Sequence, residues 1–159
     1  MTYSSGRRSH AAALLIALAT VMGCAGSDDT PLAPVDDNPF RALVAGSDTT
    51  LDIATWNLKE FALAGDQTVA LVAEAITAMN LDVVALQEVA QGSRFNQLVA
   101  QLPGWSGHRA PSGGEWSLAY LWRSDTITLG PDGLREIYPD ENTPFPRAPL
   151  VFDLVFGGE

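Results

Sequence analysis

Two polar residues, Asn57 and Glu88, stand at or near the ends of two segments that have the pattern of β-strands. Residues 51–57 alternate apolar and polar side chains and close on Asn57, and residues 81–89 form an almost continuous apolar run that contains Glu88. If these strands are parallel neighbours, both side chains emerge at one carboxyl edge of the sheet, where α/β proteins commonly bind ligands.

Carboxylate and amide side chains suit metal and phosphate chemistry. A carboxylate at such an edge can hold Mg²⁺, which prefers oxygen ligands and keeps waters and substrate phosphates in its shell. An amide beside it can donate a hydrogen bond to a phosphoryl oxygen without adding charge. The spacing alone leaves an alternative open, in which Asn57 caps a turn and Glu88 is an ordinary solvated side chain.

The elements that would position this pair alternate along the chain. Residues 67–79 and 94–102 place apolar side chains at helical spacing, and Pro103-Gly104 ends the second helix. The remaining strands are expected at residues 105–110, 117–123, 126–129, 134–138 and 148–156. This order predicts an α/β fold with a mixed β-sheet and helices on one face. Two helices cannot cover the apolar faces of residues 82–86, 118–122 and 150–156 together, so we expect one of these faces to lack a cover.

The strings around the two strand ends resemble the first two motifs of the endonuclease/exonuclease/phosphatase superfamily, whose fold is deoxyribonuclease-I-like. They are Ile53-Ala54-Thr55-Trp56-Asn57-Leu58 and Asp82-Val83-Val84-Ala85-Leu86-Gln87-Glu88-Val89. The resemblance continues through Leu118-Ala119-Tyr120-Leu121-Trp122-Arg123 and Phe145-Pro146-Arg147-Ala148-Pro149-Leu150 and covers about residues 51–156. It implies the first half of a four-layer α/β sandwich.

The resemblance also implies residue roles. Glu88 would be the metal-binding carboxylate, and Asn57 the amide that orients the phosphate and the metal shell, with Mg²⁺ or Mn²⁺ as the metal. Arg147 matches the arginine of the family's R-x-P stretch and is expected near the substrate phosphate; the alternative is a structural arginine that covers an edge strand. The implied activity is metal-dependent hydrolysis of a phosphodiester or phosphomonoester.

The sequence departs from the family pattern at several points. Lys59 stands where some nuclease branches have an acid, and Trp116 where the deoxyribonuclease branch has a glutamate. The family's strand histidine, G-D-x-N motif and Asp-His pair have no counterpart here, and His108 matches no family role. We therefore expect the amino-terminal half of a phosphoesterase, with little or no hydrolysis by this chain alone. The alternative is a complete, non-catalytic binding module carried by a membrane-anchored lipoprotein.

The first residues have the pattern of an export signal. Residues 1–10 are polar with two arginines, and the apolar run 11–23 is shorter than the roughly 20 residues that span a bilayer. Val21-Met22-Gly23-Cys24 resembles the lipobox of bacterial lipoproteins, which implies a signal peptide over residues 1–23 and a lipid on the Cys24 thiol. An ordinary secretory signal with a chance cysteine is the alternative.

Composition sets the remaining boundaries. Residues 24–49, which are rich in proline and aspartate, are typical of an extended tether, so we place the domain at residues 50–159.

The net charge of −10 opposes a broad basic face for nucleic acid, and a phosphate-handling protein with this charge needs a bound cation. By the lipoprotein sorting pattern, Ala25 favours an exported protein anchored at the outer membrane or cell surface.

Replacing Cys24 by Ala should release the exported protein from the membrane, because the substitution removes the thiol that would carry the lipid. Mass spectrometry of membrane fractions should find the acylated cysteine in the wild type. An exported wild-type chain that is soluble and carries an unmodified Cys24 would contradict the prediction.

Overall fold

The computed structural model describes residues 39–40, 42–140 and 144–157, all of which belong to one compact unit. The signal peptide, Cys24 and most of the expected tether lie outside these residues, so their roles stay predictions. None of the helices in the described part of the chain is long and apolar enough to span a bilayer.

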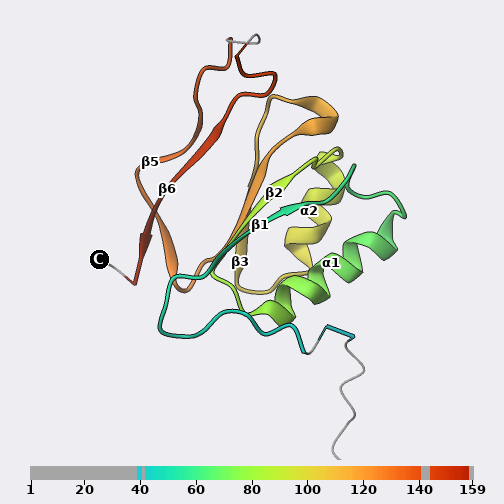
Figure 1. Cartoon of the computed structure of the whole chain (residues 1–159), viewed down its shortest axis with the longest axis vertical. Helices are drawn as coiled ribbons and strands as arrows, with labels where there is room; N and C mark the ends of the chain where they lie inside the picture. The colour runs from blue at the N-terminus through green and yellow to red at the C-terminus, as the bar shows by residue number, and fades with distance from the viewer. Residues whose placement is uncertain (1–38, 41, 141–143, 158–159) are drawn as a thin grey trace, which may run out of the picture. The chain divides into compact units, whose positions relative to one another are not determined.

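A βαβ unit forms the part of the sheet that carries Asn57. Strand β1 (Ile53–Asn57) is followed by helix α1 (Asp66–Met79) and strand β2 (Val83–Gln87). β1 and β2 pair in parallel, with Asn57 opposite Gln87 (Figure 1). A helical crossover is the usual way to join neighbouring parallel strands. The condition for a shared carboxyl edge, that these two strands are parallel neighbours, is therefore met.

A hairpin completes a four-stranded mixed sheet in the order β1-β2-β4-β3. Helix α2 (Gly92–Ala100) leads from β2 into β3 (Trp105–Arg109), and β4 (Ala119–Arg123) runs antiparallel to both β2 and β3. The strands expected at residues 105–110 and 117–123 are therefore present and pair as a hairpin.

The two helices and one face of the sheet enclose the larger hydrophobic core. Its fully buried members include Val69, Ile76, Val84, Leu98 and Leu121. Helix α2 approaches β3 so closely that a Cβ atom on Gly107 would lie 2.6 Å from Val99 Cγ2 and 2.9 Å from Phe95 Cζ. A side chain at that position would displace the ends of these two side chains and of Leu121.

A second, two-stranded sheet covers part of the opposite face. It consists of β5 (Ile127–Glu136) and β6 (Leu150–Phe156), so the strands expected at 126–129 and 134–138 are one strand with a register shift. The Phe152 ring centroid lies 5.0 Å from that of Trp122 and 5.2 Å from that of Tyr120. This packing buries Val83, Trp122 and Ile127 in a smaller core.

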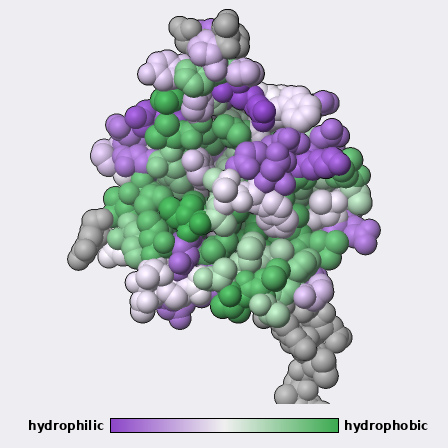
Figure 2. Space-filling model, in the orientation of Figure 1, coloured by the Kyte–Doolittle hydropathy of each residue, from purple (hydrophilic) through white to green (hydrophobic). Residues whose placement is uncertain are grey.

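The expectation of uncovered apolar surface is therefore wrong for β2 and β4, where β6 itself supplies the cover. Apolar surface is instead left open on β1, a strand to which the expectation did not refer, where Ile53 is 58% exposed. Apolar surface also gathers over the lower parts of β5 and β6, where Leu129 is 51% exposed (Figure 2). The protein thus covers one face with helices and only part of the other with strands.

Hydrogen bonds fasten the amino-terminal ends of β1 and β2 and the chain that precedes β1. The buried Asp82 carboxylate accepts hydrogen bonds from the Asp52 N–H at 2.9 Å and from Thr126 Oγ1 at 3.0 Å. Residues 45 and 46, within the expected tether, each donate a backbone N–H to the Met79 carbonyl at 3.0 Å. The chain before β1 is thereby held against the end of α1.

Replacing Phe152 by Ala should lower the free energy of unfolding by about 2 kcal/mol, below the ~3–5 kcal/mol typical of fully buried phenylalanines, because this ring is partly exposed. Urea denaturation measures the change. Val155→Ala is the matched control, because Val155 lies outside the smaller core. Equal losses in both variants would contradict the packing of β6 against the sheet.

Candidate functional site

The two residues singled out by the motifs meet at the carboxyl edge of the sheet. Asn57 is the last residue of β1, and Glu88 follows the last residue of β2. Asn57 Nδ2 donates a hydrogen bond to Glu88 Oε1 at 2.8 Å. Asn57 is exposed and Glu88 is half-buried, so both side chains are open to a ligand from solvent.

The turn after β1 fixes the orientation of the Asn57 amide. The Lys59 N–H donates to Asn57 Oδ1 at 2.8 Å, and the Leu58 N–H donates to the Gln87 carbonyl at 3.0 Å. Lys59 and Glu60 both have left-handed backbone conformations, with φ of 46° and 57°. Because its oxygen is engaged by this turn, the amide presents its nitrogen donor to Glu88.

Glu88 also has a left-handed backbone, with φ of 58°. Such values are uncommon outside glycine and recur where a site needs a particular side-chain direction. The Glu88 carbonyl accepts hydrogen bonds from the N–H groups of Phe61 and Ala90, both at 3.0 Å. These contacts hold the sharp turn that directs the carboxylate toward Asn57.

Arg109 fastens the segment that follows Glu88. Its Nε donates to the Val89 carbonyl at 2.8 Å and its Nη2 to the Ala90 carbonyl at 3.2 Å. The same Nη2 donates to the carbonyl of Gly114, in the short 3-10 helix η1 (Gly114–Trp116). The sequence pattern does not single out Arg109; the available signal is an arginine that closes a strand just before a Pro-Ser-Gly-Gly turn.

Arg147 lies over the Trp116 ring, with its guanidinium carbon 5.9 Å from the ring centroid. Trp116 belongs to the same sheet edge as Glu88, because its neighbour Ser117 accepts a hydrogen bond from the Val89 N–H at 2.9 Å. No hydrogen bond or ion pair in the described chain joins Arg147 to Asn57 or Glu88. A role of Arg147 in substrate binding stays a prediction.

His108 lies away from this edge. It is paired with Tyr120 in the middle of the β3–β4 ladder, and β3 is separated from β2 by β4. This position gives it no contact with the Asn57–Glu88 pair.

Glu88 can hold a metal ion through one oxygen. Oε1 accepts from Asn57, whereas Oε2 has no partner among the described residues. Those residues contain no group of three or more His, Cys, Asp or Glu side chains arranged to hold a metal. Mg²⁺ needs only one or two carboxylates when waters and phosphates complete its shell. The donor set therefore fits Mg²⁺ bound to Glu88, with Asn57 orienting the carboxylate.

A hollow of about 240 Å³ lies at the loops around this pair. It is lined by Glu60, Ala62, Leu63, Ala90, Gln91 and Glu115. The lining residues come from the turn after β1, the segment after β2 and η1, which are the segments that the hydrogen bonds of Glu88 and Arg109 hold together. Neither Asn57 nor Glu88 lines the hollow itself, which lies against the segments that follow them in the chain.

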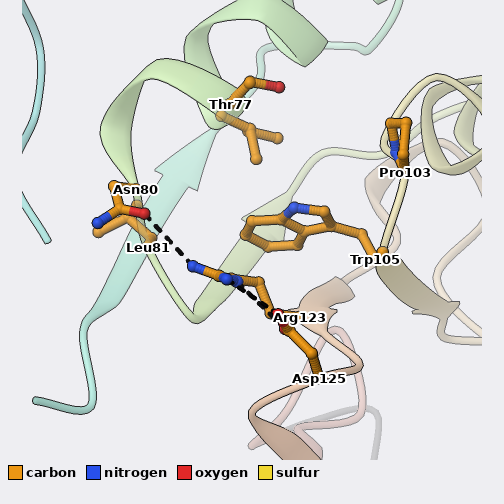
Figure 3. A pocket seen from close by; sticks show the side chains of 9 residues that line it. Thr77, Asn80, Leu81, Pro103, Trp105, Arg123 and Asp125 are labelled. Atoms are coloured by element: carbon orange, nitrogen blue, oxygen red, sulfur yellow. Dashed lines mark hydrogen bonds and ion pairs between the residues drawn. The ribbon is translucent and has the colours of Figure 1, made fainter. Parts of the chain in front are cut away.

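A second hollow, of about 190 Å³, lies at the opposite end of β2 (Figure 3). Its Arg123 is held by Asp125 at 3.0 and 3.2 Å and by Asn80 at 3.3 Å. The hydrogen bond from Arg123 holds the pKa of the Asp125 carboxyl below its ordinary value. The cation of this hollow is therefore already paired, and the hollow lies at the amino end of β2, away from Asn57 and Glu88.

No family model matches the chain, and no curated protein matches it. A solved structure of humanized D. rerio TDP2 with 14 mutations superposes with a TM-score of 0.57 at 17% identity, over 69% of this chain and 46% of that one. TDP2 has the deoxyribonuclease-I-like fold. This chain has that fold too. The predicted fold class is confirmed, and the chain spans less than half the length of that structure.

Replacing Arg109 by Lys should loosen the loops that hold Glu88, because lysine lacks the planar fork that serves three carbonyls. We expect a loss of about 1–3 kcal/mol in the free energy of unfolding. Amide hydrogen exchange should rise at Val89–Gln91 and in η1. Arg135→Lys, on β5, is the control and should leave exchange in both segments unchanged.

Proposed function

We propose that this chain carries the metal-binding and phosphate-binding edge of a magnesium-dependent phosphodiester hydrolase. The single observation that carries the proposal is the hydrogen bond from Asn57 to Glu88 at the carboxyl edge of a deoxyribonuclease-I-like sheet. TDP2 is a metal-dependent phosphodiesterase, which agrees with this class of activity. At 17% identity the likeness supports the fold, and the Asn57–Glu88 pair supports the chemistry.

Each side chain has a separate task in this proposal. Glu88 Oε2 would hold Mg²⁺ or Mn²⁺, and the bond from Asn57 keeps the carboxylate in place. The second hydrogen of Asn57 Nδ2 is left to donate to a phosphoryl oxygen. Arg147 would approach the same phosphate from the Trp116 side. The bound metal would stabilise charge on the phosphoryl oxygens and the leaving group.

The chain's own residues support binding better than turnover. In the family mechanism a histidine with a carboxylate activates the attacking water, and no histidine stands beside Glu88 in the described chain. We therefore propose that hydrolysis requires groups beyond those at this edge. The substrate is a phosphodiester or phosphomonoester, met at a membrane to which the lipid on Cys24 anchors the protein.

The assay needs a protein that contains this chain together with the further groups that hydrolysis requires. In that protein, Glu88→Gln should reduce magnesium-dependent hydrolysis of bis(p-nitrophenyl) phosphate by more than about 100-fold, because it removes the charge that holds the metal but keeps the volume. Asn57→Ala should cost about 10–100-fold, the usual effect of losing a group that orients a metal ligand. Initial rates with and without chelator measure both effects.

Glu74→Gln, an exposed change on α1, is the matched control and should leave the rate unaltered. A hydrolysis rate that chelator does not lower, or that is unchanged in Glu88→Gln, would contradict the proposal of a metal-dependent hydrolase. A full-length protein that binds phosphodiesters without cleaving them would favour the lipoprotein binding module instead.

A further inference from the structure

Lys59 stands apart from the other cations of the described chain. Its ammonium makes no hydrogen bond or ion pair there. Each of the other described cations has a partner: Arg94 with Asp66, Arg109 with three carbonyls, Arg123 with Asp125, Arg135 with Asp132 and Arg147 with the Trp116 ring. The free cation is the one that lies two residues from Asn57.

The backbone of Lys59 is held beside the site. Its N–H donates to Asn57 Oδ1 at 2.8 Å, and the turn is closed two residues later by the bond from the Phe61 N–H to the Glu88 carbonyl at 3.0 Å. A lysine stem extends about 6 Å from Cα to Nζ. The exposed ammonium can therefore reach a phosphate bound next to Asn57 and Glu88 without any movement of the backbone.

The electrostatic field at this edge is negative, so a cation there would help to attract a phosphate. Glu60 and Glu115 line the adjacent hollow, and the whole chain has a net charge of −10. An approaching phosphate meets this negative field, which a metal on Glu88 offsets only in part. An unpaired lysine can bind the phosphate without first breaking an ion pair, so its full charge is available to the ligand.

We propose that Lys59 binds the phosphoryl oxygens of the substrate and so sets the affinity of the site for phosphate. The inference rests on the proposed function, since it places the phosphate at the Asn57–Glu88 pair. Some nuclease branches of the resembled family have an acid at this position. A cation there offsets part of the negative field that Glu60 and Glu115 create, whereas an acid at this position would strengthen it.

The test is a calorimetric titration of the full chain with inorganic phosphate in the presence of Mg²⁺. Lys59→Met keeps the length of the stem and removes the charge, and it should weaken phosphate binding roughly tenfold, as expected for one lost hydrogen bond between charged groups. Lys59→Arg should retain most of the affinity. Arg135→Met removes the same charge from an ion pair on β5 and should leave phosphate affinity unchanged. Thermal melts confirm that every variant is folded.

The outcomes separate this inference from the proposed function. Wild-type affinity in Lys59→Met, an equal loss in Arg135→Met, or no phosphate binding by the wild type overturns the role of Lys59. If Glu88→Gln and chelation weaken phosphate binding but Lys59→Met does not, the inference alone fails. If Lys59→Met weakens binding but Glu88→Gln and chelation leave it unchanged, the Lys59 contact stands and the proposed function fails.

Discussion

The parallel register between β1 and β2 is the constraint on which the candidate site depends. It sets Asn57 opposite Gln87, so that the residue after Gln87 comes within hydrogen-bond reach of the Asn57 amide. A shift by one residue would turn every side chain of β1 to the other face of the sheet. The apolar face of β1 and the position of its final amide are therefore fixed together.

The loops at this edge hold Asn57 and Glu88 in position for the candidate site. Three backbone N–H groups, from Leu58, Lys59 and Phe61, close the turn after β1 onto Gln87, Asn57 and Glu88. From the other side, Arg109 holds the carbonyls that follow Glu88. Main-chain donors thus hold the turn after β1, and the Arg109 side chain holds the segment after Glu88.

The sequence predicts much of this arrangement because its signals are local. Alternation in residues 51–57 and the apolar run around Glu88 predict the two strands, and the helical spacing between them predicts the helix that joins them. The parallel pairing is a condition that the sequence leaves open and the structure meets. The packing of Phe152 on Trp122 was not predictable in this way, because it joins segments 30 residues apart that carry no pairing signal. The role of Arg109 was not predictable either. Its guanidinium binds backbone carbonyls, which every residue has, so no sequence pattern marks its partners.

Lys59, Glu60 and Glu88 all have left-handed backbone conformations, which lower the stability of this edge. Glycine would relieve a conformational cost on the order of 1 kcal/mol at each position, yet glycine has neither an ammonium nor a carboxylate. Selection for thermal stability alone would therefore drive these positions toward glycine or asparagine. A charged side chain at each of these positions therefore comes at a cost in stability, which a function at this edge, as we propose, would explain.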